Sequence, residues 1–212
     1  MDIRVQRLRE TMELLGPVVP KKPTIASLAG VLLKDGTAMA TDLESAVSVE
    51  LVEAEGACLI PYRPVAELLK HVPGDKTLAV EQEGKQVHLA WPGGRASYET
   101  HDPQDYPPLP QVSAALEQTV DGDTLVAALV TASQYCAAGE DRPVLTGVCL
   151  GLGDSLEIAA GDGFRMAYQT LPIGLPARDD LKQAVIPAGA VRLLDHLWQK
   201  TPRPAPVAET PS

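Results

Sequence analysis

The residues best suited to chemistry are the turn Gly161-Asp162-Gly163 and the three residues after it, Phe164-Arg165-Met166. Glycines around an aspartate are typical of a tight turn with accessible backbone groups. An aromatic side chain, a cation and a flexible apolar side chain then follow in succession. Because apolar surface with a few polar anchors suits peptide recognition, we expect this stretch to bind a peptide and not to break bonds. The alternative is that Phe164 and Met166 simply fill a core.

Nothing else in the sequence predicts catalysis, a metal or a cofactor. The glycine-rich P-loop motif and the GxSxG motif of nucleophilic serines are both absent. Asp42 and Asp162 are expected to hydrogen-bond within turns. The histidines lack metal-ligand spacing and are His71, His88, His101 and His196. We therefore expect a non-catalytic protein.

The composition predicts an aliphatic core, because 45% of the 212 residues are hydrophobic and only 4% are aromatic. The formal net charge of −10 argues against a simple basic nucleic-acid-binding protein, although it is compatible with one basic face on an acidic molecule. The three cysteines are widely spaced, with no CxxC motif. Together with a charged N-terminus and no apolar run of membrane-spanning length, they predict a cytoplasmic protein with reduced thiols and no membrane contact.

The first hundred residues predict a helix followed by three strands, twice over. Residues 2–15 carry apolar side chains at helical spacing, and Pro61 to Pro64 opens a second helix, which Val72-Pro73-Gly74 ends. Alternating apolar residues predict the strands. Three strands follow the first helix, over 25–33, 38–42 and 45–52, and three follow the second, over 78–82, 87–91 and 96–100; a further short strand over 57–60 precedes the second helix.

Beyond residue 100 the pattern starts again. The proline-rich residues 101–109 predict an extended linker. Next we expect a strand over 116–120, a helix led in by Asp121-Gly122-Asp123, a loop and three strands from residue 141 to about 168, a strand over 183–186 and a helix opened by Pro187. In the first of the three strands Val144, Val148 and Leu150 would alternate, in the second Leu156 and Ile158 would do so, and the third would begin at Phe164.

The two halves resemble each other, and the offset between matched segments grows from 117 to 126 residues, as small loop insertions would produce. The matched pairs are 30–33 with 147–150, 40–42 with 160–162, and Ile60-Pro61 with Ile186-Pro187. This pattern predicts a tandem domain duplication.

The duplication is incomplete, because a proline-rich tail stands where three further strands are expected. We predict a first domain over 1–110, a truncated second domain over 111–200 that lacks its last three strands, and a disordered tail over 201–212. The sheet of the second domain would then present an unpaired edge and uncovered apolar surface.

Over residues 3 to about 200, these segments resemble the N-terminal domain and most of the central domain of the bacterial replicative sliding clamp, the beta subunit of DNA polymerase III. The resemblance rests on several motifs in the same order. They are Lys22-Pro23-Thr24, 31–33, 40–44, 94–98, 105–110, 142–148 and 162–167.

The resemblance implies an α+β DNA-clamp fold, with tandem units of helices and antiparallel sheets, the helices on the inner face and the sheets outside. It implies a non-catalytic processivity factor that tethers polymerase to duplex DNA, without a cofactor. Lys22, Arg63 and Arg142 would contact backbone phosphates weakly, unless they are ordinary solvated charges. Polymerase and clamp-loader peptides would bind a groove formed by Leu145, Gly161, Gly163, Phe164, Arg165 and Met166.

Some features depart from the family pattern. Gly161 and Phe164 stand where the family has a threonine and a histidine, and no Lys or Arg lies between Asp121 and Arg142. A third domain is also missing, so we do not expect the usual two-subunit ring. Two alternatives therefore stay open: a clamp-derived interaction module that binds clamp partners or other clamp chains without encircling DNA, and a gene fragment.

Overall fold

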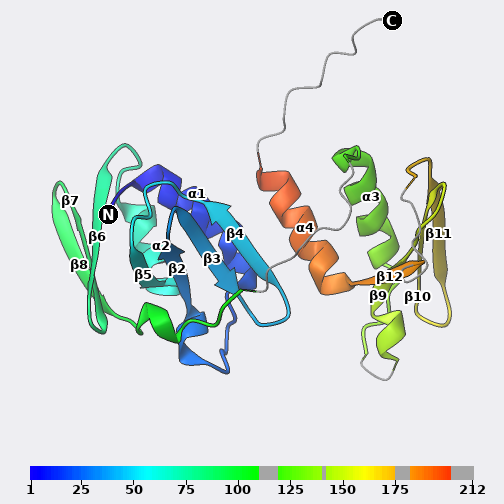
Figure 1. Cartoon of the computed structure of the whole chain (residues 1–212), viewed down its shortest axis with the longest axis horizontal. Coiled ribbons are helices and arrows are strands. Elements are labelled where there is room, and N and C mark those ends of the chain that lie inside the picture. Colours follow the sequence, from blue (N-terminus) through cyan, green and yellow to red (C-terminus); the bar gives the residue numbers. More distant parts are fainter. Residues whose placement is uncertain (110–118, 140–141, 175–181, 202–212) are drawn as a thin grey trace, which may run out of the picture. The chain divides into compact units, whose positions relative to one another are not determined.

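The computed structural model describes residues 1–109, 119–139, 142–174 and 182–201. The chain forms two compact units, residues 1–113 and 114–212. Each unit combines helices with antiparallel sheets (Figure 1), which confirms the predicted α+β class.

One sheet of the first unit has the strand order β4-β3-β2-β5. Its strands are β2 (Gly30–Lys34), β3 (Thr37–Thr41), β4 (Ala46–Glu50) and β5 (Ala57–Pro61). Asp35 and Gly36 form the two-residue turn between β2 and β3, with φ of 48° and 79°. An Asp-Gly pair suits this turn, because both residues need the left-handed region. The predicted hairpin over 25–42 is therefore confirmed, but residues 26–29 form the 3₁₀ turn η2 (Ala26–Ala29) instead of a strand.

The other sheet of the first unit has the order β1-β6-β7-β8. It contains β1 (Asp2–Arg4), β6 (Thr77–Glu83), β7 (Gln86–Trp91) and β8 (Gly94–Glu99). The prediction of a helix from residue 2 is wrong for its first turn, because Asp2–Arg4 pairs with β6 and buries Ile3 completely. Helical spacing holds only from Val5 onward.

Two helices complete this unit, α1 (Val5–Leu15), which runs on into η1 (Gly16–Val18), and α2 (Tyr62–His71). They pack against each other, α1 also against β3 and β4, and α2 against β5. The Arg9 guanidinium donates to the carbonyls of Leu69 and Val72, at 2.6 and 2.9 Å. These carbonyls lie at the end of α2, where the helix itself offers no donors. Arg9 thus joins α1 to the end of α2.

Residues 101–109 are not the extended linker that the prolines predict. They contain the turn η3 (Pro103–Asp105), and the Tyr106 ring packs on Leu28, Leu32 and Leu59. The Tyr106 hydroxyl accepts a hydrogen bond from the Thr41 backbone N–H at 3.1 Å. An aromatic side chain anchors the segment to the first unit, which a composition rule for linkers cannot detect.

The second unit has one sheet among its described residues, in the order β11-β10-β9-β12. Its elements are α3 (Gly122–Ser133), η4 (Pro143–Leu145), β9 (Gly147–Gly151), β10 (Leu156–Gly161), β11 (Met166–Leu171), β12 (Gln183–Pro187) and α4 (Ala188–Lys200). The Asp121 carboxylate accepts from the Thr124 N–H at 3.0 Å and so caps α3 where the sequence predicts its start. Leu156 and Ile158 are buried, as their alternation predicts.

Two strand predictions in the second unit are wrong. Val144 is 71% exposed and belongs to η4, because Pro143 favours the first position of a short helical turn. The third strand begins at Met166, after the turn that contains Phe164. The predicted strand over 116–120 is absent at Thr119 and Val120, and its other residues, like the tail after Thr201, lie outside the described residues.

The internal repeat is confirmed by strand register. Gly30 pairs with Pro61 in the first unit, and the matched Gly147 pairs with Pro187 in the second. In both units a helix follows this pairing strand directly, α2 after β5 and α4 after β12. The first unit has a second sheet beside these elements, and the described part of the second unit does not.

Candidate partner-binding groove

A surface cavity of about 490 Å³ lies in the second unit, and all six predicted groove residues line it. It lies between η4, the strands β9 and β10, and the turn before β11. Sequence reasoning missed the other lining residues, which are Val144, Gly147, Cys149, Ala159 and Ala160. Most of these are small, so they leave room for a ligand but carry no recognisable motif.

The turn over residues 161–166 is organised by Asp162. Its Oδ1 accepts from the backbone N–H groups of Phe164 and Arg165, at 2.9 and 2.8 Å, and its Oδ2 pairs with the Arg165 guanidinium at 3.1 Å. These two backbone N–H groups, with the Arg165 side chain, lower the pKa of the Asp162 carboxyl to about 2. Asp42 accepts from Glu44 and Ser45 in the matched turn of the first unit, so both aspartates act in turns as predicted.

Apolar side chains at the cavity are exposed to an unusual degree. Phe164 is 98% exposed and Met166 73%, and Val144 stands beside them. The alternative that Phe164 and Met166 fill a core is therefore wrong. Exposed apolar side chains clustered around a concave surface are typical of ligand and peptide sites.

Two arginines flank the groove. The Arg165 guanidinium lies 5.4 Å from the centre of the Tyr135 ring, so the cation is held over an aromatic face. Arg142 is exposed, and its Nη1 is 3.2 Å from where a Cβ on Gly163 would lie. Arg142, predicted to contact DNA, thus lies beside the turn that forms the groove.

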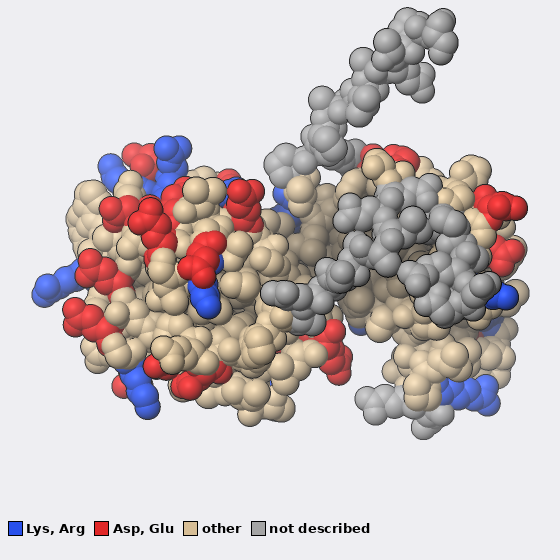
Figure 2. Space-filling view, in the orientation of Figure 1, with Lys and Arg blue, Asp and Glu red and all other residues tan. Residues whose placement is uncertain are grey.

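The other two predicted DNA contacts lie together on the first unit. Arg63, in the first turn of α2, donates from Nη2 to the Lys21 carbonyl at 3.1 Å, next to Lys22. The side chains of Lys21, Lys22 and Arg63 are not buried. Sequence reasoning missed Lys21, although its position beside Lys22 was a signal. On the face shown in Figure 2, Lys and Arg are interspersed with Asp and Glu, so that face carries no broad basic surface.

Burial makes the Cys58 thiol hard to ionise, because desolvation raises its pKa to about 12. Across the described ranges no group of three or more His, Cys, Asp or Glu side chains could hold a metal ion. No helix in those ranges has the length and apolar character needed to cross a membrane.

Comparison with known proteins identifies relatives in sequence and in fold. The beta sliding clamp of Synechocystis sp. is 30% identical over 199 residues, which are 86% of this chain and 50% of that protein. The Escherichia coli beta sliding clamp is 29% identical over 187 residues, 82% of this chain and 50% of that protein. The search against protein-family models gave no match.

Solved structures of beta clamps are similar to this chain in fold. The crystal structure of the DNA polymerase III subunit beta from Pseudomonas aeruginosa superposes with a TM-score of 0.82 at 24% identity, covering 93% of this chain and 56% of that one. The chain thus spans about half the length of the curated relatives it matches. In sequence and in fold, it is a homologue of the bacterial beta sliding clamps over that half.

Proposed function

We propose that this chain is a non-catalytic tether of the sliding-clamp type, whose second unit holds peptide segments of replication proteins while its first unit contacts duplex DNA. The observation that carries the proposal is the apolar cavity of about 490 Å³ with Phe164 and Met166 exposed beside it. The relationship to beta sliding clamps supports the same function.

The groove suits a short peptide with large apolar side chains. Small residues on β9 and β10 leave space for such side chains, and Phe164 and Met166 offer apolar walls. Arg142 adds positive charge at the groove, whereas the charge of Arg165 is already paired with Asp162; the Arg142 charge favours a peptide that also carries a carboxylate. Polymerase and clamp-loader segments are the proposed partners.

The peptide proposal is tested with a fluorescein-labelled peptide from the clamp-binding segment of a DNA polymerase III polymerase subunit. Replacing Met166 by aspartate is expected to weaken binding about tenfold or more, because the variant removes apolar contact worth about 1.5–3 kcal/mol and brings a charge to the groove. Fluorescence anisotropy measures the Kd.

The matched control is Val52→Asp, since Val52 is an apolar residue of the first unit that is 70% exposed and does not line the groove. It should bind the peptide like the unaltered chain. Equal affinity of the Met166→Asp variant and the control would contradict the groove assignment.

For DNA, the cluster of Lys21, Lys22 and Arg63 supports contact with backbone phosphates, because accessible cations bind duplex DNA without reading its bases. A second candidate function is an interaction module that does not encircle DNA. It is favoured by α3, which contains no Lys or Arg and has Asp123 in its first turn.

Salt dependence separates these two functions. The double variant Lys22→Glu/Arg63→Glu is expected to lower the slope of log Kobs against log salt by about two, at ~0.9 for each phosphate that is no longer neutralised. The control Lys34→Glu/Lys85→Glu makes the same charge change at exposed positions in strand β2 and in the turn after β6. If both variants change the slope equally, or if the unaltered chain binds no duplex DNA, the interaction module is the better account.

A further inference from the structure

The internal repeat places a filled site in the first unit at the position that the groove has in the second unit. In the first unit the Tyr106 ring packs on Leu28, Leu32 and Leu59, and Met39 packs beside them. Leu32 lies opposite Met39 on β3 and opposite Leu59 on β5. The four residues that hold the ring are called here the tyrosine seat.

The second unit repeats this arrangement of strands. Cys149 lies opposite Ala159 on β10 and opposite Val185 on β12, which is the register of the first unit. Leu145 ends the 3₁₀ turn before β9, as Leu28 lies in the 3₁₀ turn before β2. Leu145, Cys149 and Ala159 line the groove. The groove is therefore the copy of the tyrosine seat in the second unit.

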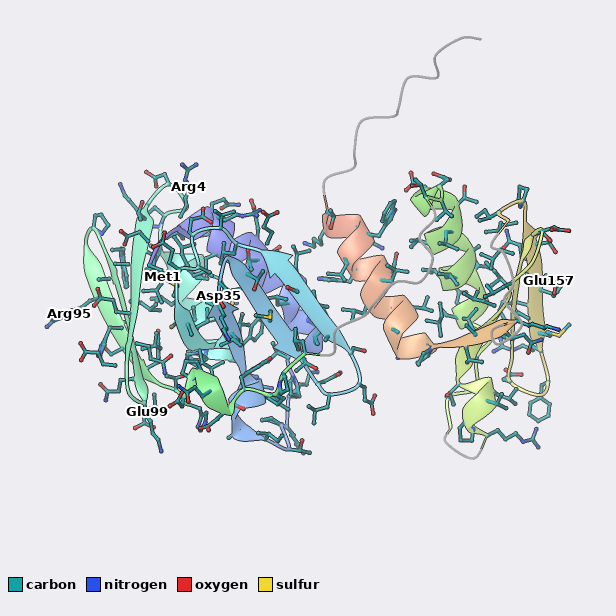
Figure 3. All side chains as sticks on the ribbon, in the orientation of Figure 1. Met1, Arg4, Asp35, Arg95, Glu99 and Glu157 are labelled. Carbon is teal, nitrogen blue, oxygen red and sulfur yellow. The ribbon has the colours of Figure 1, made fainter. Side chains whose placement is uncertain are left out.

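The copy in the second unit is open and has smaller side chains than the tyrosine seat. Glu157, labelled in Figure 3, lies two residues before Ala159 on the same face of β10 and is exposed. Because protein interiors are close-packed, smaller residues under the position of the ring leave room that a large side chain can fill. The matched pairs that differ in size are Leu32 with Cys149, Met39 with Ala159, and Leu59 with Val185.

The groove also keeps the hydrogen-bond donor that the tyrosine hydroxyl uses. The Thr41 N–H donates to the Tyr106 hydroxyl at 3.1 Å, and Gly161 matches Thr41 in the repeat. The Asp162 N–H donates to the Arg165 carbonyl at 3.2 Å, so by the alternation of an antiparallel ladder the Gly161 N–H points away from β11. It points toward β9, whose pairing with β10 ends two residues earlier. Within the described part of the chain this N–H has no acceptor.

We propose that the groove selects a tyrosine side chain from an extended segment of a partner protein, and that this tyrosine is seated as Tyr106 is seated in the first unit. Its ring packs on Leu145, Cys149 and Ala159, and its hydroxyl accepts from the Gly161 N–H. This specificity rests on the proposed function of the groove and names the side chain that the groove prefers. A phenylalanine in the same place would bury the Gly161 N–H without an acceptor, so the site discriminates against it.

Three synthetic peptides of residues 102–109, acetylated and amidated at their ends, test the proposal by titration into the ¹⁵N-labelled full chain. The peptide with Tyr106 should bind at the groove with a Kd below about 1 mM. The Tyr106→Phe peptide should bind about tenfold more weakly. The Tyr106→Ala peptide, which lacks the ring, should cause no measurable shift at that concentration. The Gly161 amide proton should move downfield with the tyrosine peptide and not with the phenylalanine peptide.

The peptides differ in one side chain and the labelled chain is the same in every titration, so the comparison does not depend on the folding of a variant. Equal affinities of the tyrosine and phenylalanine peptides, a Gly161 proton that does not move, or shifts centred on Thr41 would each overturn the proposal.

The polymerase peptide separates this proposal from the proposed function. If it binds the groove and the tyrosine peptide does not, only the tyrosine specificity is wrong. If neither peptide binds, the groove assignment is contradicted as well.

Discussion

Replacing Tyr106 by alanine is expected to lower the free energy of unfolding of the first unit by about 3–5 kcal/mol. The ring is 6% exposed and packs on Leu28, Leu32 and Leu59, so its removal leaves a cavity at the base of the sheet. The variant also removes the aromatic anchor of residues 101–109, which leaves hydrogen bonds such as the one from the Ser27 hydroxyl to the Asp105 carbonyl to hold the segment. Urea unfolding followed by Trp91 fluorescence, in a Trp198→Phe background, measures the change for this unit alone.

Tyr106→Phe is the matched control, because it keeps the ring and removes only the hydroxyl. The buried Thr41 N–H then loses its acceptor, at an expected cost of about 1–3 kcal/mol. Burial raises the pKa of Tyr106 from 10.0 to about 12. The folded state therefore holds the Tyr106 hydroxyl proton more tightly than the unfolded state does. The free energy of unfolding should fall as the pH rises from 10 through about 12, because the unfolded state loses this proton first.

The Tyr106→Phe variant has no hydroxyl to titrate, so it should not show this fall in the free energy of unfolding above pH 10. A stability change within about 0.5 kcal/mol for Tyr106→Ala, the range of an ordinary surface substitution, would show that residues 101–109 behave as the free linker that their prolines predict.

Leu59→Ala should destabilise the chain by about 2–5 kcal/mol, whereas Val185→Ala at the matched position should change stability by no more than about 0.5 kcal/mol. Both residues lie two positions before the proline that ends their strand. Leu59 is 1% exposed and Val185 is 48% exposed. Chemical denaturation of the two variants in parallel provides the measurement.

The difference arises from what covers each strand. The Leu59 N–H donates to Gln82 Oε1 at 2.8 Å, and its carbonyl accepts from the Thr100 hydroxyl. Gln82 lies in β6 and Thr100 directly follows β8, so the second sheet completes the edge of β5. The described part of the second unit offers β12 no such cover. If Leu59→Ala and Val185→Ala lower the free energy of unfolding equally, strands β5 and β12 are covered to the same extent in solution.

Local patterns predicted most of the fold. Alternation in 156–161 and helical spacing in 5–15 reflect contacts that each segment makes on one face, so the sequence carries them. The Asp-Gly turn at 35–36 and the cap at Asp121 are likewise local. The repeat was predictable because matched motifs such as Ile60-Pro61 and Ile186-Pro187 lie at the same point of each unit.

What the sequence could not predict depends on contacts between distant segments. Ile3 lies in a strand only because β6 is beside it, where it pairs with Leu78. Tyr106 turns a proline-rich stretch into part of a core. In the groove, the residues after Asp162 were predictable from their types, but Ala159, Ala160 and Cys149 became lining residues only when β9 and β10 paired.

Arg142 shows the same limit for function. Its type suited a DNA contact, but the structure places its guanidinium beside Gly163, at the groove. Lys22 and Arg63 are far apart in the sequence and lie together only because the loop before η2 meets the start of α2.

The most direct test of the central claim is amide chemical-shift mapping of the ¹⁵N-labelled chain, titrated with the unlabelled polymerase peptide. If the groove is the partner site, the largest shifts should fall on the amides of Leu145, Gly161 and 163–166, with little change in the first unit. No shift at a peptide concentration of about 1 mM, or shifts centred on the first unit, would contradict it.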